Sequence, residues 1–321
     1  MGAADAAVAQ GAGGVILFGS IAPSGLAAGI RALDAVAKQG LAPLIMTDEE
    51  GGGVQRMANL VGELPWARQM AETMSPAQVQ ALAKSVGLRM RQSGVTMDLA
   101  PVADVDGGPG PNAIDPDGAR SFSANPAVAS TYALAFAKGL EAAGVVPVFK
   151  HFPGLGGATG NTDDGPAATQ PLPALEKSGL IPFRAAVAQG VPAIMVANAT
   201  VPGLTDQPAS LSAQVIQGLL RGQLGFQGLV LTDSLSAGAI QALNLSVAQA
   251  SVRAIGAGAD MVMFNSAAPD LVLHQIEAAM ESAVTSGAIQ RHTLISAATE
   301  VLAAKGVDLC SPGSLARGGS G

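Results

Sequence analysis

The feature that most constrains the fold is a series of seven short apolar runs, each followed by a polar or glycine-containing turn and then by a helix-like stretch. Uninterrupted apolar runs of this length are typical of parallel strands that are buried on both faces. Stretches such as 76–91, 126–143 and 213–224 carry Ala, Leu and Val at helical spacing. The alternation predicts a parallel sheet with right-handed crossovers. The seven runs are residues 14–18, 43–47, 96–101, 146–149, 193–196, 229–232 and 261–264.

The predicted fold class is α/β, as a single TIM-type (β/α) barrel over residues 1–310 that is missing or irregular at its first strand. A chain of 321 residues suits one such barrel. A closed barrel has eight strands, so the eighth would lie upstream of Met1 or escape recognition. A doubly wound open sheet is the alternative, although no GxGxxG follows the first run, which disfavours its nucleotide-binding version. Residues 311–321, rich in Ser, Gly and Arg, are predicted to form a flexible tail.

Charge and composition exclude several classes of function. Acidic and basic residues are scattered, the formal net charge is −7, and no Lys/Arg stripe with interleaved aromatic residues is present, so a nucleic-acid partner is not expected. The single cysteine, Cys310, cannot form an intrachain disulfide. The 3 histidines are far apart in the sequence and predict no metal site. We expect neither a metal nor an organic cofactor.

The sequence holds no apolar run approaching the roughly 20 residues that cross a membrane. The N-terminal residues 1–14 lack the basic segment and the long apolar core of a signal peptide, and they begin within a predicted helix. We expect an exported protein or lipoprotein whose leader has been removed, with a cytoplasmic protein as the alternative.

Polar residues follow the apolar runs at the points where an active site would be built. Asp48, Asp98, Lys150, His151 and Asp233 each lie at or just past the C-terminal end of a run. In a barrel these ends meet on one face, where catalytic residues gather. Each aspartate alone could be a turn or N-cap residue, but the set indicates a site.

The segment 150–156, KHFPGLG, is the most distinctive of the chain. A lysine and a histidine are costly to bury without partners, and sugar hydroxyls would supply them. A structural ion pair between the lysine and an aspartate is the alternative. The chain continues into the glycine-containing loop 157–165, which carries the adjacent carboxylates Asp163 and Asp164. This loop is either a solvated turn or a lid that delivers an acid to a substrate.

Three further segments complete the predicted site. The segment 229–235 places Asp233 at the exit of a buried strand, which suits the nucleophile of a retaining glycosidase, with an N-cap role as the alternative. The segment 47–56, TDEEGGGVQR, puts acidic groups at a strand end, followed by glycines that allow close approach to a ligand and by Arg56. Arg120 lies in a predicted loop, where an arginine alone is often solvated.

Taken in order, the segments TDEEGGGVQR, LAPVADVD, ARSFS, KHFPGLG and LTDSLS resemble the N-terminal barrel of glycoside hydrolase family 3, especially its single-domain β-N-acetylglucosaminidase branch. The resemblance covers about residues 13–265, and KHFPG with the Asp-Glu-Gly-Gly stretch is quite specific. It implies a retaining mechanism through a covalent glycosyl-enzyme. Asp233 matches the nucleophile, while Asp98 lies in the family's core motif and is expected to be structural. Five residues match those that hold the hydroxyls of the terminal sugar: Asp48, Arg56, Arg120, Lys150 and His151.

The acid/base loop departs from that branch, in which KHFPGHG is followed after a short spacer by Asp-Ser-His, whose Asp–His pair protonates the leaving group. Here the equivalent stretch is Asn161-Thr162-Asp163, and Leu155 replaces the earlier histidine. Asp163 is therefore the candidate acid/base. An aspartate carboxyl ordinarily titrates near about pH 3.9. This role predicts an acid-shifted pH optimum, unless burial or the neighbouring Asp164 opposes ionisation.

Three hypotheses follow. In the first, the chain removes a terminal β-linked N-acetylglucosamine, or a related sugar as a β-glucosidase would, with cell-wall fragments as the default substrates. In the second, it is a catalytically weak sugar-binding barrel. In the third, Lys150 forms a Schiff base in a different barrel chemistry. Because Trp66 and Tyr132 are the single Trp and Tyr of the chain, we expect a small pocket for one sugar. The expected partner is a small carbohydrate. We also expect the protein to be a monomer.

Overall fold

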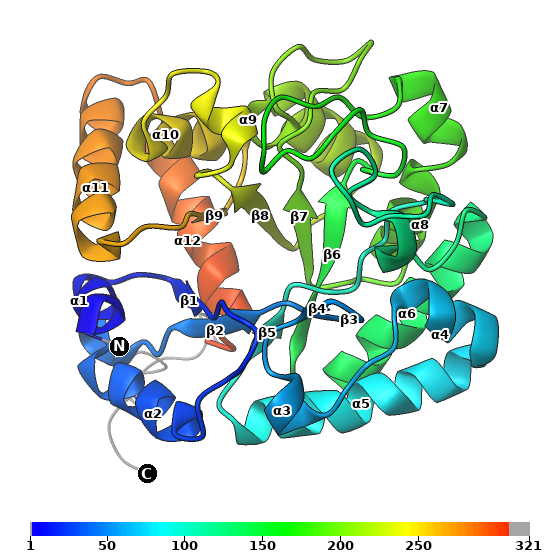
Figure 1. The fold of residues 1–321 in the computed structure, drawn as a ribbon. Helices are drawn as coiled ribbons and strands as arrows, with labels where there is room; N and C mark the ends of the chain where they lie inside the picture. Colours follow the sequence, from blue (N-terminus) through cyan, green and yellow to red (C-terminus); the bar gives the residue numbers. More distant parts are fainter. Residues whose placement is uncertain (1, 308–321) are drawn as a thin grey trace.

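The computed structural model describes residues 2–307, so the predicted tail 311–321 and Cys310 lie outside the described residues. Its centre is a parallel sheet of seven strands in the order β1-β2-β5-β6-β7-β8-β9 (Figure 1). Each of the seven predicted runs supplies one strand, which confirms the parallel sheet. The strands are β1 (Gly14–Ile16), β2 (Leu44–Thr47), β5 (Met97–Asp98), β6 (Val146–Phe152), β7 (Ala193–Val196), β8 (Leu229–Ser234) and β9 (Met261–Met263).

Both faces of the sheet are buried, as uninterrupted apolar strands require. Along β2, Leu44 and Met46 pack in a cluster formed almost entirely by strand side chains, which is the packing of a barrel interior. Ile45, between them, joins the larger cluster that the surrounding helices cover. The alternation follows from the two-residue period of a strand, and it buries both faces of the inner strands, whereas the edge strand β1 is half-buried. The polar residues of the strands are therefore concentrated at the strand ends.

Helices connect successive strands and surround the sheet (Figure 1). Serines define the start of two of them: Ser75 and Ser246 each form a capping box with the glutamine three residues later. The segment predicted as a helix over 213–224 forms a π-helix over Gln214–Gln223. The longer helices are α1 (Gly2–Gln10), α2 (Leu26–Val36), α5 (Pro76–Gln92), α6 (Pro126–Glu141), α8 (Leu180–Ala188), α10 (Val247–Ala257), α11 (Pro269–Thr285) and α12 (Arg291–Ala304). The shorter ones are α3 (Ala58–Val61), α4 (Ala67–Thr73), α7 (Leu172–Lys177) and α9 (Gly238–Gln241).

Small residues allow the helices α5 and α6 to approach each other closely. A Cβ atom added to Gly139 would lie 2.3 Å from the carbonyl oxygen of Gln80, and one added to Gly87 would lie 2.8 Å from the Cβ of Ala143. Real Cβ atoms do not come this near to backbone. Glycine and alanine at these positions therefore allow the two helices to pack closely.

The sheet has two free edges, β1 and β9. Within residues 2–307 no eighth strand joins the sheet, and β1 and β9 both line an apolar cavity of about 480 Å³. The architecture is thus the predicted TIM-like α/β fold, with seven of the eight strands of a closed barrel. Among the helices of residues 2–307, none combines the length and hydropathy needed to traverse a bilayer.

Candidate active site

A cavity of about 300 Å³ opens at the C-terminal ends of the strands. All seven residues that the sequence nominated line it, although they come from four separate stretches of the chain. Asp48 follows β2, Lys150 and His151 lie near the end of β6, and Asp233 lies near the end of β8. Loops and turns supply the other three: Arg56, Arg120 and Asp163. Of the five polar residues at strand ends, Asp48, Lys150, His151 and Asp233 share this cavity, whereas Asp98 does not line it.

The hairpin of β3 (Glu49–Gly51) and β4 (Val54–Gln55) shapes one wall of the cavity. Its turn residue Gly52 has φ +55°, and an added Cβ would lie 2.0 Å from the ring of Trp66, so only glycine fits. Glu49 is buried within the hairpin, where its carboxylate accepts the backbone N–H groups of Arg56 and Met57, both at 2.6 Å. Glu49 therefore holds the backbone that carries Arg56 to the cavity.

Lys150 is the centre of a buried ion-pair network. Its Nζ lies 2.7 Å from Oδ1 of Asp48 and 2.6 Å from Oε1 of Glu50, and its side chain is 3% exposed. Burial alone would lower the pKa of Lys150, but the two carboxylates outweigh it and raise that pKa above the ordinary lysine value. A lysine held protonated in this way is a poor nucleophile. The geometry therefore argues against the Schiff-base hypothesis. It also shows the ion pair between this lysine and an aspartate, which was the alternative to a purely sugar-binding role of the segment 150–156.

Arg120 extends this network on the other side of Glu50. Its Nε and Nη2 donate to the two carboxylate oxygens of Glu50 at 2.8 and 2.9 Å. Burial opposes ionisation of Glu50, yet Arg120 and Lys150 together hold its pKa well below the ordinary value. The loop arginine is therefore paired rather than solvated. The turn that carries it, Gly118–Arg120, is fixed by Arg68 of α4, which donates to the carbonyl oxygen of Gly118 at 2.6 Å.

His151 is held by Asp104, a residue of the loop that follows β5. This loop runs beside β6, where the N–H of Ala103 donates to the carbonyl oxygen of Lys150 at 2.6 Å. Nδ1 of His151 lies 2.7 Å from Oδ2 of Asp104, and Oδ1 of Asp104 also accepts the N–H of Leu155 at 2.6 Å. Burial, and then the charges of Arg120 and Lys150, lower the pKa of His151, so the imidazole is neutral near pH 7.

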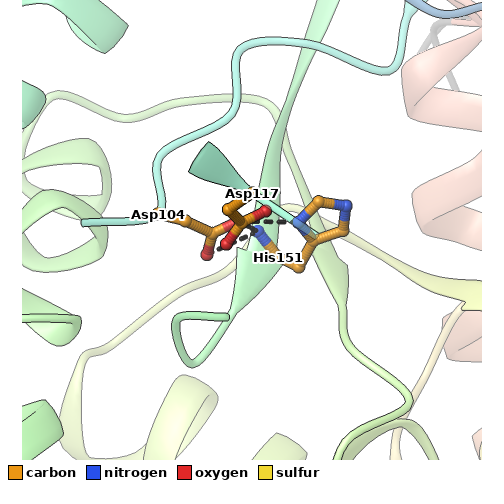
Figure 2. Close-up of side chains that lie close together, drawn as sticks. All are labelled: Asp104, Asp117 and His151. Carbon is orange, nitrogen blue, oxygen red and sulfur yellow. Dashed lines mark hydrogen bonds and ion pairs between the residues drawn. The ribbon is translucent and has the colours of Figure 1, made fainter. Parts of the chain in front are cut away.

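Asp117 completes this group, and Figure 2 shows it beside Asp104 and the ring of His151. It is fully buried, and neither of its carboxylate oxygens has a hydrogen-bond partner. Its nearest cation is Arg120, with Nη1 3.6 Å from Oδ1. Burial, followed by the negative charge of Asp104, raises the pKa of Asp117 to about 8. Burial also raises the pKa of Asp104 to about 7, opposed by its backbone hydrogen bonds.

Asp104, Asp117 and His151 also lie close enough together to be considered as metal ligands, with donor atoms within 4.8 Å of one another. The spacing fits a hydrogen-bonded group better. Ligand atoms about 2.0–2.1 Å from a tetrahedral zinc lie about 3.3 Å apart, whereas Nδ1 and Oδ2 are 2.7 Å apart. The guanidinium of Arg120 also places a positive charge next to Asp117.

Asp233 and Asp163 are brought to the same cavity by a backbone connection. The N–H groups of Gly238 and Ala239, which begin α9 after β8, donate to the carbonyl oxygens of Asp163 and Thr162 at 2.9 Å. Asp233 is partly buried, and this burial raises its pKa, with Asp163 acting in the same direction and His151 opposing it. Asp163 is exposed at the cavity mouth. The loop 157–165 is therefore tied to the strand that carries the predicted nucleophile.

One predicted residue does not line the cavity, and three residues of the site were not predicted. Asp98 is fully buried and does not line the cavity; its Oδ1 accepts the N–H of Glu49 at 2.9 Å, which fits the expected structural role. The sequence reading did not nominate Glu50, Asp104 and Asp117. Glu50 could have been found, because residues 48 and 50 point to the same side of an extended segment. Asp104 lay in the quoted segment LAPVADVD, but no pattern there indicated its contact with residue 151.

The comparisons with known proteins agree with this geometry. The model of the glycosyl hydrolase family 3 N-terminal domain matches residues 4–304. The chain is 42% identical over 237 residues to the beta-hexosaminidase LpqI of Mycobacterium tuberculosis, an alignment that spans 71% of this chain and 60% of that relative's length. A glycosyl hydrolase of family GH3 from Mycobacterium smegmatis has a similar structure, with TM-score 0.85, 39% identity and coverage of 94% of this chain and 92% of the other.

The beta-N-acetylhexosaminidase of Beutenbergia cavernae is also similar, with TM-score 0.84, 34% identity and coverage of 95% of this chain and 92% of the other. The family model covers nearly all of the described residues. The chain therefore belongs to glycosyl hydrolase family 3, through the N-terminal domain of that family.

Proposed function

We propose that this chain is a retaining glycoside hydrolase that removes a terminal β-linked sugar, with Asp233 as the nucleophile. The observation that carries the proposal is the cavity itself. Of its four carboxylates, Asp48 and Glu50 are paired with Lys150, whereas Asp163 and Asp233 form no ion pair among the described residues. Two unpaired carboxyl groups in one sugar-sized cavity are what a retaining glycosidase requires.

The proposed reaction has two steps. In the first, the carboxylate of Asp233 attacks the anomeric carbon, the bond to the leaving oxygen breaks, and Asp163 donates a proton to that oxygen. In the second, the carboxylate of Asp163 takes a proton from water, and the water oxygen displaces Asp233 from the anomeric carbon. The paired groups of the network, with Arg56 and His151, hold the hydroxyls of the sugar. Each of these groups is kept in place before the sugar arrives, so little reorganisation accompanies binding.

The proposed substrate is a terminal N-acetylglucosamine, with fragments of the cell wall as its source. The choice of N-acetylglucosamine is supported by the names of two similar proteins, a beta-hexosaminidase and a beta-N-acetylhexosaminidase. A cavity of about 300 Å³ supports a single sugar unit rather than a long chain. Trp66 and Tyr132 do not line it, so the described site offers no Trp or Tyr ring for stacking. We further propose that residues 1–310 act as one domain and that the protein is a monomer.

A second function, a sugar-binding barrel with little turnover, is favoured by one observation. Asp163 is exposed, its neighbour Asn161 is neutral, and no histidine of the described chain lines the cavity apart from His151. A proton donor at the mouth of the cavity would then be weak. This function keeps the sugar contacts and loses only the proton transfer.

The decisive experiment measures turnover of aryl β-N-acetylglucosaminide and aryl β-glucoside across pH 4–8 for the wild type, Asp233→Ala and Asp163→Ala. We expect Asp233→Ala to abolish turnover of both substrates. Asp163→Ala should impair substrates with poor leaving groups most, because activated aryl groups depart without protonation. Mass spectrometry after reaction with an activated fluorosugar should show the sugar attached to Asp233. Sugar binding by calorimetry without turnover at any pH would replace the hydrolase proposal with the binding function.

A further inference from the structure

The group behind the cavity has a defined chemical arrangement, which Figure 2 shows. Nδ1 of His151 faces Asp104, and the second ring nitrogen points away from both aspartates. His151 lines the cavity, and among the side-chain hydrogen bonds of residues 2–307 none involves its Nε2. The protein therefore satisfies one ring nitrogen and leaves the other to the cavity.

The position of the proton in the Asp104–His151 pair decides what Nε2 can do. If the proton lies on Nδ1 and is donated to Asp104, Nε2 is an acceptor. If Asp104 carried the proton and donated it to Nδ1, Nε2 would be a donor. The two arrangements place opposite hydrogen-bonding properties in the cavity, although the heavy atoms are the same.

The surroundings of Asp104 favour its ionised form. Besides Nδ1, it accepts the N–H of Leu155 at 2.6 Å and the N–H of His151 at 3.2 Å, and hydrogen bonds from N–H groups stabilise a carboxylate. Asp117 accepts no hydrogen bond from residues 2–307, and its nearest cation, Arg120, lies 3.6 Å away. Two buried carboxyls this close cannot both ionise easily. The shared proton therefore belongs on Asp117, which leaves Asp104 charged and able to accept from Nδ1.

We propose that Asp104 is a positioning residue that fixes the tautomer of His151 with the proton on Nδ1, so that Nε2 presents an acceptor to the cavity, and that the neutral acid Asp117 keeps Asp104 ionised. Asp104 itself does not reach the cavity and acts through the histidine. The tautomer is a property of the protein without substrate. The effect on turnover rests on the proposed glycosidase function, so the two can fail separately.

Nitrogen-15 NMR of the imidazoles tests the tautomer directly. His274 and His292 are both exposed, so a His274→Gln/His292→Gln background leaves a single histidine signal with little cost to the fold. At pH 7.5 we expect a neutral ring with the proton on Nδ1. A proton on Nε2, or a doubly protonated ring, would overturn the proposal. This measurement needs no change at Asp104, so it stands even where a variant fails to fold.

The variant Asp104→Asn should reverse the tautomer. The amide oxygen of asparagine can take the backbone N–H groups, which leaves its NH₂ group to donate to Nδ1 and moves the proton to Nε2. We expect this reversal together with a fall in kcat/KM of at least about 10-fold, the lower end of what partners that orient histidines contribute. Asp117→Asn is the matched variant for the tautomer: it replaces a neutral acid by a neutral amide and should preserve the proton on Nδ1.

Two results would contradict the assignment. Asp104→Asn with an unchanged tautomer and unchanged kcat/KM would show that Asp104 does not position the ring. Addition of Zn²⁺ to the protein at micromolar concentration should leave the Nδ1 resonance in place, and its displacement would show that Nδ1 is a metal ligand instead. A reversed tautomer with no measurable turnover in any variant would retain the positioning role and refute the glycosidase function alone.

Discussion

Replacement of Asp117 by asparagine should increase the free energy of unfolding, relative to the wild type, by more at pH 7 than at pH 5. The side chain is fully buried without a hydrogen bond, and burial raises its pKa to about 8. In the unfolded chain an aspartate loses its proton near about pH 3.9. Between these values the native state binds one proton more than the unfolded state, so the free energy of unfolding falls as pH rises. One proton corresponds to about 1.4 kcal/mol per pH unit.

Over the two units from pH 5 to pH 7, Asp117 is therefore expected to remove about 2.7 kcal/mol of stability that the asparagine variant keeps. Urea denaturation of wild type and Asp117→Asn at pH 5, 6 and 7 measures this difference directly. Titrating groups that do not interact with Asp117 are common to both proteins and cancel. Asp206→Asn is the control, since Asp206 is exposed. A stability difference between wild type and Asp117→Asn that does not change with pH would refute the reasoning.

Three further outcomes are expected. Lys150→Met should cost about 3–5 kcal/mol in urea denaturation at pH 7, because it leaves Asp48 and Glu50 without their shared cation; unchanged stability would show that the network is not buried as described. Gly139→Ala should lower the melting temperature despite the better helix propensity of alanine, because its Cβ would lie 2.3 Å from the carbonyl oxygen of Gln80. The control Gly256→Ala should be neutral or stabilising, because the nearest atom to its Cβ would be Cγ1 of Ile289 at 3.8 Å. The pH–rate profile of the wild type should lose activity as pH falls through the raised pKa of Asp233, since the nucleophile must be ionised, and a profile without this acidic limb would contradict the role of Asp233.

The sequence predicted the sheet well because buried parallel strands leave a simple signal. Seven uninterrupted apolar runs became seven strands, and the positions just after them became one face of the molecule. The π-helix over Gln214–Gln223 was not predicted as such, because its buried residues recur at a four-residue interval that an α-helix also places on one face; they are Val215, Ile216, Leu219 and Leu220. The lack of an eighth run in the sequence corresponds to the open edges of β1 and β9.

The site was predicted less evenly. Residues at strand ends, such as Asp48 and Asp233, could be located from hydrophobicity alone. Asp104 and Asp117 could not, because they lie in irregular loops whose path depends on long-range contacts. Asp104 reaches His151 because the loop after β5 runs beside β6, and the chain near Asp117 is fixed by Arg68 from α4. No local pattern records contacts of this kind, which join residues 47 and 50 positions apart.

The contrast between paired and unpaired carboxylates distinguishes the proposed sugar-binding residues from the proposed nucleophile and acid/base, which sequence position alone does not do. Asp48 and Glu50 are bound to cations before a sugar arrives, so their charges can orient hydroxyls but are not free to attack carbon or to carry protons. Asp233 is partly buried, which suits a nucleophile protected from bulk water. Asp163 is exposed at the mouth, where a proton lost to the leaving group can be regained from solvent. Burial thus distinguishes the two chemically identical side chains to which we assign different roles, in a chain whose acid/base loop lacks the histidine typical of the β-N-acetylglucosaminidase branch.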